Sequence, residues 1–329
     1  MALLVSLLAG LLPMLFYAWL LYHLDRYEKE PFALLAGVFF WGALFAAGSA
    51  FLINSTVNVG LNILLQSESA SFFTLATLVA PPVEETVKGM AVLGIYLLFR
   101  SEFDSRLDGI LYAAVTALGF AAAENAYYLH HFGFQSAGWS GFLKVFAVRV
   151  LLVGWQHPFY TAFFGLGLAA ARSSRSWTLR WIAPLMGWWA AVILHMVHNL
   201  FSGLIESAAG VLLASLWDWI GYLGLFIYIL LLIDREQDWI QEYLPEEVEL
   251  GTFTKSQYTS MSSLSRQIAS LWKARRHGAW RETRRFFQLA GELSHKKRQL
   301  IREIAMPESD QIIQNLRAQL QCLSKTLPS

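Results

Sequence analysis

Two adjacent carboxylates and a lysine interrupt a strongly apolar stretch of the chain. Glu84, Glu85 and Lys88 lie within residues 72–98, where most of the other side chains are apolar. On membrane-insertion scales, each such charge near the centre of a spanning helix costs about 2.5–3.5 kcal/mol. Lys88 lies three and four residues after the carboxylates, so a helix would let it pair with either. The pattern indicates either an ion pair that fixes helix packing or a chemical site inside the membrane.

Three further apolar segments carry groups of the same kind. Glu124 follows a run of alanines, where a carboxylate serves either in a packing hydrogen bond or in a site. His157 and His195 can stay neutral in lipid, and neutral imidazole is a common metal ligand. Asn199 lies one helical turn after His195, on the same face. Each residue alone has a structural explanation, such as a hydrogen-bonded buried histidine.

Membrane-spanning helices are needed to position these groups. The 329-residue chain is 56% hydrophobic, with a mean hydropathy of +0.43. It contains about seven apolar runs near the length that crosses a bilayer. The predicted spans are residues 3–21, 32–53, 72–98, 107–129, 142–171, 179–201 and 211–233.

Composition changes after residue 233. Residues 1–233 contain 10 Lys and Arg, whereas residues 234–329 contain 15. We therefore expect an all-α polytopic membrane helix bundle over residues 1–233, followed by a basic, helical cytosolic tail over residues 234–329. The single cysteine, Cys322, excludes an intrachain disulfide and a multi-cysteine metal site. The first span lacks a charged leader and an obvious cleavage site, so we expect it to be retained.

Loop charges predict the orientation of the bundle. Lys and Arg occur in the loops after the first, third and fifth spans, and none occurs in the loops at 54–71, 130–141 and 202–210. The positive-inside rule then puts the N-terminus outside and the tail in the cytoplasm. The fifth span is long for one crossing, and Gly154 and Pro158 are expected to divide it.

The polar groups fall at similar depths in this topology. With 1.5 Å of rise per residue, Glu84 lies roughly 18 Å from the outer end of its span, Glu124 roughly 8 Å and His195 roughly 9 Å. His157 would begin the true fifth span on the same side. Each of these side chains alone has a structural explanation, whereas four helices that bring such groups to similar depths indicate a site in the outer half of the bilayer. Asp218, between two tryptophans, is interpreted as an interface anchor.

Four motifs in this order resemble the PrsW family of intramembrane proteases, which is distantly related to the CAAX prenyl endopeptidases. They are Glu84-Glu85-Thr86-Val87-Lys88 (EExxK), Phe120 to Glu124-Asn125 (FxxxEN), His157 followed by Gly165, and His195-Met196-Val197-His198-Asn199. The resemblance covers about residues 10–230. Two departures are Asn199, where PrsW has an acidic residue, and the added tail.

The resemblance implies a bacterial inner-membrane peptidase that cuts a membrane-anchored protein, such as an anti-sigma factor, on the outer side. The expected partner is a single-span membrane protein and not a nucleic acid. Two mechanisms stay open. In one, Glu124, His157 and His195 hold zinc while Glu84 or Glu85 is the general base. In the other, no metal takes part, a carboxylate activates water with a histidine, and Asn199 and His195 polarise the carbonyl.

Two rival classes of function are compatible with buried charges. A transporter or proton relay would spread them across the membrane depth, whereas here they cluster on one side. A scaffold would need no water-activating group.

The tail combines basic and apolar residues. Residues 255–302 contain 12 Lys and Arg and two Glu, interleaved with apolar side chains. This pattern predicts either an amphipathic helix on the anionic inner leaflet or an ordinary solvated helical bundle. Residues 307–309 are expected to form a linker, and a final helix at 310–323 is expected to mediate self-association.

Overall fold

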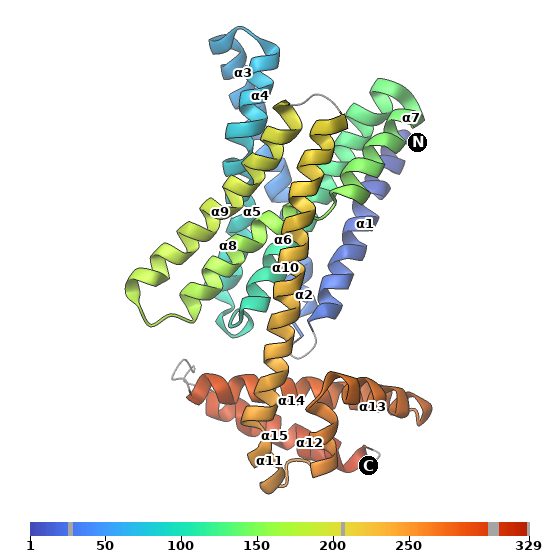
Figure 1. Cartoon of the computed structure of the whole chain (residues 1–329), viewed down its shortest axis with the longest axis vertical. Coiled ribbons are helices and arrows are strands. Elements are labelled where there is room, and N and C mark those ends of the chain that lie inside the picture. Colours follow the sequence, from blue (N-terminus) through green and yellow to red (C-terminus); the bar gives the residue numbers. More distant parts are fainter. Residues whose placement is uncertain (26–28, 205–207, 302–308, 328–329) are drawn as a thin grey trace. The chain divides into compact units, whose positions relative to one another are not determined.

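The structure is a computed structural model that describes residues 1–25, 29–204, 208–301 and 309–327. Within these ranges the regular elements are helices, and no strand occurs among them (Figure 1). The chain divides into two compact units. The first comprises Met1–His23 and Glu30–Ile227, and the second comprises Leu24–Lys29 and Tyr228–Ser329. The all-α class is confirmed.

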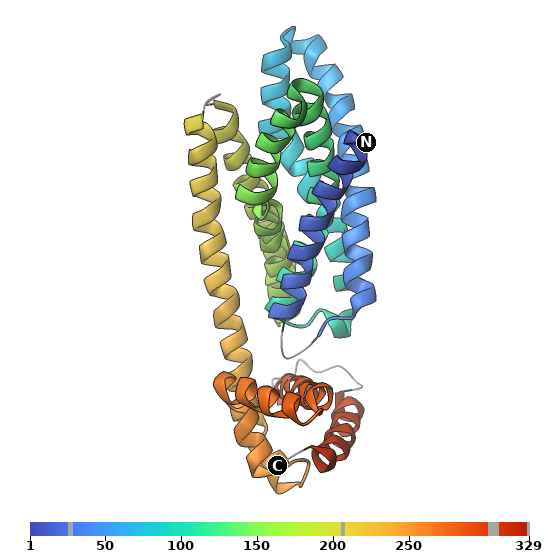
Figure 2. The same cartoon turned by 90° about the vertical axis from the view of Figure 1, so that its right-hand side faces the viewer.

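The helices of the first unit run roughly alongside one another in both Figure 1 and Figure 2. Short π-helical turns join several α-helices into longer stretches. The elements are α1 (Ala2–Leu24), α2 (Phe32–Phe40), η1 (Trp41–Ala46), α3 (Ala47–Leu65), α4 (Glu68–Thr74), η2 (Leu75–Val79), α5 (Ala80–Leu98), η3 (Arg100–Glu102), α6 (Arg106–Tyr128), η4 (Leu129–Phe134), α7 (Gln135–Val145), η5 (Phe146–Leu152), α8 (Gln156–Arg172), α9 (Trp177–Leu204) and α10 (Ala208–Tyr243), whose last part belongs to the second unit.

Five helical stretches in the described residues are long and apolar enough to cross a membrane. They are Ala2–Leu24, Phe32–Leu65, Arg106–Arg172, Trp177–Gly203 and Leu212–Tyr243. The third contains two of the predicted spans, 107–129 and 142–171. The predicted span 72–98 is helical but lies outside the five, and its α5 part carries two carboxylates and a lysine.

Helix α6 is the central element of the first unit. All of its residues from Leu107 to Ala122 are buried, which requires neighbours on every side. Small residues permit the necessary close approach. A Cβ atom on Gly165 of α8 would lie 1.9 Å from the carbonyl oxygen of Gly109, and one on Gly119 would lie 1.9 Å from that of Phe39. The glycines therefore bring backbones together around the polar centre of the bundle.

Two predicted loops are helical instead. Helix α3 continues beyond residue 53 and ends at Leu65, where Gln66 takes a left-handed conformation with a φ of 50°. Residues 130–141 lie in η4 and α7, with a kink at Ala137 and Gly138. The absence of Lys and Arg from these segments said nothing about regular backbone structure. The loop predicted at 202–210 lies partly outside the described residues.

The predicted division of the fifth span is confirmed. The helical path breaks at Val153–Trp155, and α8 starts at Gln156. Pro158 lies in the first turn of α8, where its missing N–H leaves no helical hydrogen bond unmade. The break places His157 at the start of a new helix rather than in the middle of a continuous one.

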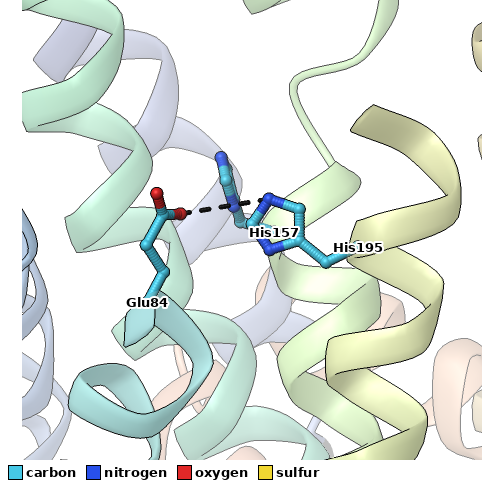
Figure 3. A group of neighbouring side chains, drawn as sticks. All are labelled: Glu84, His157 and His195. Carbon is cyan, nitrogen blue, oxygen red and sulfur yellow. Dashed lines mark ion pairs between the residues drawn. The ribbon is translucent and has the colours of Figure 1, made fainter. Parts of the chain in front are cut away.

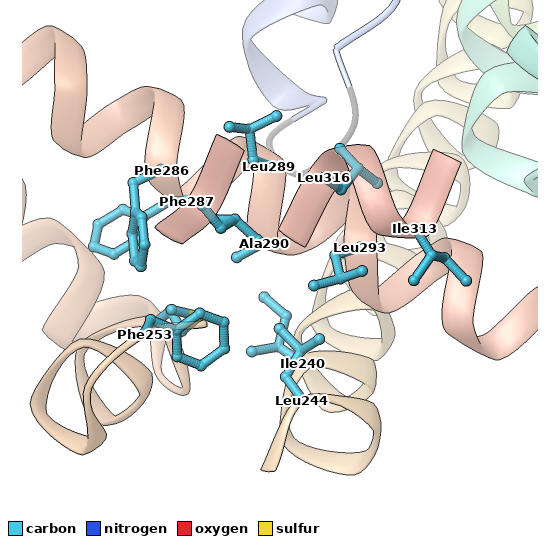
Figure 4. Packing of buried hydrophobic residues seen from close by; sticks show 12 residues of the cluster. Ile240, Leu244, Phe253, Phe286, Phe287, Leu289, Ala290, Leu293, Ile313 and Leu316 are labelled. Carbon is cyan, nitrogen blue, oxygen red and sulfur yellow. The ribbon is translucent and has the colours of Figure 1, made fainter. Parts of the chain in front are cut away.

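The second unit is a helical bundle with its own apolar core. Its further elements are α11 (Pro245–Glu249), α12 (Lys255–Met261), α13 (Leu264–Arg276), α14 (Trp280–Ile301) and α15 (Ser309–Thr326). Phe286 and Leu293 of α14 pack with Ile240 and Leu244 at the end of α10 and with Leu316 of α15 (Figure 4). The helical tail is confirmed. The linker predicted at 307–309 falls largely on residues that the structure does not describe.

The second unit also contains a buried carboxylate that forms ion pairs with two other helices. Glu247, whose side chain is fully buried, lies 2.9 Å from Lys297 Nζ and 2.7 Å from Arg317 Nη2. Burial alone would raise the pKa of Glu247, but hydrogen bonds from Arg317, Lys297 and Thr252 outweigh it and hold that pKa below its usual range.

Candidate active site

The start of helix α5 places both carboxylates inside the bundle. Pro81 and Pro82 occupy the first turn of α5, which follows the π-helical turn η2. Because proline has no N–H, Pro81 and Pro82 cannot donate hydrogen bonds back to the carbonyl groups of η2. Glu84 and Glu85 therefore lie one turn into the helix. Their exposed fractions are 8% and 1%, and Lys88 is fully buried.

Glu85 is held by three polar side chains from three helices. Its Oε1 lies 2.5 Å from Lys88 Nζ and 3.0 Å from His195 Nδ1 of α9. Its Oε2 accepts a hydrogen bond of 2.8 Å from Thr161 Oγ1 of α8. A buried charge with this many partners is compensated and fixed in orientation. Glu85 thus ties α5, α8 and α9 together.

Glu84 is different from its neighbour. Its Oε2 is buried and has no hydrogen-bond partner among the described residues. The nearest ionic contact is His195 Nε2, 3.9 Å from that oxygen. Figure 3 shows the Glu84 and His195 side chains directed toward each other, with His157 beside them. A buried carboxylate oxygen without a donor requires an explanation, and a water or an ion bound at this place would supply one.

His157 is engaged on both ring nitrogens. Its Nε2 lies 2.8 Å from Glu124 Oε2 of α6, and its Nδ1 lies 3.3 Å from Lys88 Nζ. Glu124 also forms an ion pair of 2.7 Å with Arg149 of η5. The side chains of Glu124 and Arg149 are about one-fifth exposed, at 19% and 21%, whereas the rest of the cluster is more deeply buried. The pair therefore forms the accessible edge of the site.

The structure brings five of the six predicted site residues together and places the sixth elsewhere. Glu84, Glu85, Glu124, His157 and His195 form one cluster. Asn199 instead donates a 2.8 Å hydrogen bond to the carbonyl oxygen of Ala76. That carbonyl belongs to the π-helical turn η2, so Asn199 attaches α9 to the segment that precedes the carboxylates.

Three residues in or beside the cluster were not singled out as site residues from the sequence. Thr161 lies one helical turn after His157, a spacing that signals a shared face. Arg149 lies before the break in the fifth span and belongs to none of the motifs. Asp218 was interpreted as an interface anchor, but its side chain is fully buried and contacts His198 and Tyr160. A carboxylate inside an apolar span was the available signal for Asp218.

Comparison with known proteins identifies the family of the chain. Residues 30–233 match the model of a family described as PrsW family intramembrane metalloprotease. The chain belongs to the PrsW family of intramembrane proteases. It is therefore an integral membrane protein, as its apolar helices require.

Three relatives match part of this PrsW-family chain. Protease PrsW of Geobacillus kaustophilus is 27% identical over 223 residues, which is 68% of this chain and 85% of the relative. Protease PrsW of Bacillus subtilis is 27% identical over 225 residues, 68% of this chain and 88% of the relative. Protease PrsW of Clostridioides difficile is 30% identical over 122 residues, 37% and 49% of the two chains. No solved structure matches.

The donor atoms suit a divalent metal ion, with one change from the expected ligands. Atoms of Glu84, His157 and His195 lie within 4.8 Å of one another. Glu84 offers an unpartnered oxygen, and His195 has its Nε2 facing that oxygen while Nδ1 faces Glu85. Two imidazoles and a carboxylate are a familiar catalytic zinc set. Glu124, which we expected as a ligand, is not in this group and lies instead against His157.

Proposed function

We propose that this PrsW-family protein hydrolyses a peptide bond of a membrane-anchored protein, with Glu84 and His195 at the reacting atoms. The unpartnered Glu84 oxygen facing His195 Nε2 inside an apolar bundle carries this proposal. Peptide hydrolysis needs a group that activates water and a group that returns a proton to the leaving amine. Glu84 is placed to take a proton from water, and His195 Nε2, 3.9 Å from Glu84 Oε2, is placed to receive that proton and pass it to the leaving amine.

Glu85 acts on His195 rather than on the substrate. Because Glu85 Oε1 lies 3.0 Å from His195 Nδ1, the neutral ring carries its proton on Nδ1 and leaves Nε2 with a lone pair. Lys88 and Thr161 hold Glu85 for that role. Glu124 orients His157 in the same way through His157 Nε2.

In a metal-assisted version of this proposal, Glu84, His157 and His195 would instead be ligands of a divalent ion, for which zinc is the candidate. Bound zinc would supply Lewis acidity and bring the pKa of a water to about 7. His157 would bind the ion only by releasing one nitrogen from Glu124 or from Lys88.

A metal-free glutamate mechanism is the second candidate. The Lys88 ammonium lies 3.3 Å from His157 Nδ1, and this positive charge opposes a dication at that nitrogen. Metal content, chelation and zinc add-back decide between the two. Loss of cleavage on verified stripping and its return with zinc would support the metal site, and full activity in stripped protein would exclude it.

Cleavage of a tagged single-span membrane protein by reconstituted protein tests the protease proposal itself. Glu84→Gln and His195→Ala should each abolish it. Unchanged cleavage in both variants would contradict the protease assignment and favour a transport or scaffold role.

We propose the bacterial inner membrane as the location, with the N-terminus outside, the tail in the cytoplasm and the substrate cut in the outer half of the bilayer. An anti-sigma factor fits as a substrate because it is a membrane-anchored regulator. The exposed Cys322, the single cysteine of the chain, is a natural reporter. A membrane-impermeant maleimide should label it only after permeabilisation of spheroplasts, and equal labelling of intact ones would reverse the orientation.

We also propose that the tail contacts anionic lipid through one face of α13. Leu264, Ile268 and Trp272 lie four residues apart and are 39%, 41% and 60% exposed. Arg275 and Arg276 are exposed at the end of the same helix. Exposed apolar residues flanked by arginines are typical of helices that lie in a membrane interface. Gln267 and Ala274, on an adjoining face of α13, are buried.

Several apolar residues of the tail are buried in its core and cannot contact lipid or a second copy of the chain. Phe286, Phe287 and Leu289 are buried in the core and do not face lipid. Ile313, Leu316 and Leu320 of α15 are buried there too, so the helix expected to self-associate uses its apolar side within the unit.

A probe at Ile268→Cys in a Cys322→Ser background tests lipid contact in nanodiscs, with the exposed neighbour Ala269→Cys as control. Contact predicts that the probe at 268 alone enters an apolar environment, and only with anionic lipid. Equal signals at 268 and 269 would contradict it.

A further inference from the structure

A second polar cluster lies next to the active site and is not used by the proposed chemistry. Asp218 of α10 is fully buried although it stands between two exposed tryptophans, Trp217 and Trp219. Its Oδ1 accepts a 2.7 Å hydrogen bond from Tyr160 of α8. Its Oδ2 lies 2.6 Å from His198 Nδ1 of α9. One carboxylate thus joins three helices.

This cluster contacts the active site through an aromatic ring. The Tyr160 ring stacks on the His195 ring with a centroid separation of 5.0 Å and an interplanar angle of 23°. The His157 ring meets His195 edge-on at 5.2 Å and 80°. The hydrogen bond with Glu85 fixes the position of Nδ1 but still lets the plane of the His195 ring tilt. The stacked Tyr160 ring limits that tilt, and Asp218 fixes Tyr160 through its hydroxyl.

Helix packing reinforces the arrangement. Gly221 lies three residues after Asp218, on the same side of α10. A Cβ atom on Gly221 would lie 2.2 Å from the Phe159 ring of α8, so α10 and α8 are in close contact at this level. A carboxylate in this position would be costly in lipid if its role were only to anchor a helix at the interface.

We propose that Asp218 is a positioning residue of the protease site. It accepts the hydrogen bond of the Tyr160 hydroxyl and thereby sets the plane in which His195 Nε2 faces Glu84, while His198 lies against its other oxygen without a hydrogen bond of proper geometry. Helix α10 then completes the site without contributing a group to the reacting atoms. The inference rests on the proposed function in one respect, namely that His195 acts on the substrate.

Two tyrosines at the same helix interface provide a matched test. Tyr160→Phe removes the hydroxyl that donates to Asp218. Tyr222→Phe removes a hydroxyl one turn further along α10, whose own acceptor is the carbonyl oxygen of Val153 at 3.5 Å. Loss of a partner that orients an active-site histidine typically costs about 10–100-fold in activity. We expect that fall in kcat, with KM unchanged, for Tyr160→Phe and Asp218→Asn but not for Tyr222→Phe.

The orientation of His195 is read independently of cleavage. In protein labelled with ¹⁵N-histidine, the His195 signals are assigned by their loss in His195→Ala. They should shift in metal-stripped Tyr160→Phe and Asp218→Asn and should stay in place in Tyr222→Phe. Unmoved signals in folded Asp218→Asn would overturn the proposal, as would equal shifts in all three variants. If wild-type protein cleaved nothing, these signals would still decide the positioning role.

Discussion

Separate glutamine substitutions at Glu84 and Glu85 should differ in their effect on stability although both reduce cleavage. Glu85→Gln removes the negative charge that faces Lys88 at 2.5 Å and His195 at 3.0 Å. Lys88 is fully buried, and its remaining neighbours are the His157 nitrogen at 3.3 Å and the Phe120 ring at 4.5 Å. Breaking a buried ion pair by removing one partner costs about 3–5 kcal/mol. Glu85→Gln should therefore destabilise the membrane unit.

Glu84→Gln replaces a carboxylate whose Oε2 has no hydrogen-bond partner in the described residues and whose nearest basic neighbour, His195 Nε2, is 3.9 Å away. Neutralising it also removes the penalty of keeping that charge out of water. Its effect on the free energy of unfolding should stay below about 1 kcal/mol. Its effect on chemistry should be large, because loss of a general base typically costs about 100–10,000-fold.

Two measurements on the same preparations separate the effects. Unfolding of reconstituted protein in mixed micelles gives the stability of each variant, and cleavage of a tagged single-span protein gives the rate. We expect Glu84→Gln to be stable and inactive, and Glu85→Gln to be unstable and inactive. The assigned roles would be refuted if Glu84→Gln were as unstable as Glu85→Gln, or if it retained cleavage.

Three further outcomes test other parts of the structure. Arg149→Leu removes the partner of Glu124 at the accessible edge and should reduce cleavage more than Arg149→Lys, which a rate comparison checks; equal rates would dissociate the ion pair from activity. Gly165→Ala introduces a Cβ atom 1.9 Å from the Gly109 carbonyl oxygen and should destabilise the bundle by about 1–3 kcal/mol in the micelle unfolding assay. Gly94→Ala is the control, because nothing lies within 4 Å of its Cβ position and its stability should be unchanged. Because the folded pKa of Glu247 is lowered, the stabilisation by this carboxylate is complete above the unfolded pKa and is lost as pH falls through the folded pKa. Acidification should therefore weaken the amide-exchange protection of α14 and α15 less in Glu247→Gln than in wild type.

The sequence by itself determined the membrane class and five residues of the candidate site. Both signals, apolar runs and loop charges, can be followed along the chain without knowledge of the fold. The length of an apolar run decides whether it can span a bilayer, and the Lys and Arg residues of the loops predict the orientation of the spans. The EExxK spacing also placed Lys88 within reach of the carboxylates, and it does pair with Glu85. Gly154 and Pro158 marked the break before His157 because both disturb helical backbone.

Only the tertiary structure decided which partners each polar group has. Glu84 and Glu85 are neighbours in sequence, yet α8 and α9 supply partners to one and leave an oxygen of the other open. Asn199 shares a face with His195 but bonds to η2, and Asp218 turns inward to Tyr160. These outcomes depend on how neighbouring helices are rotated and how closely they approach. Spacing along one helix defines a face, but it does not say what that face meets.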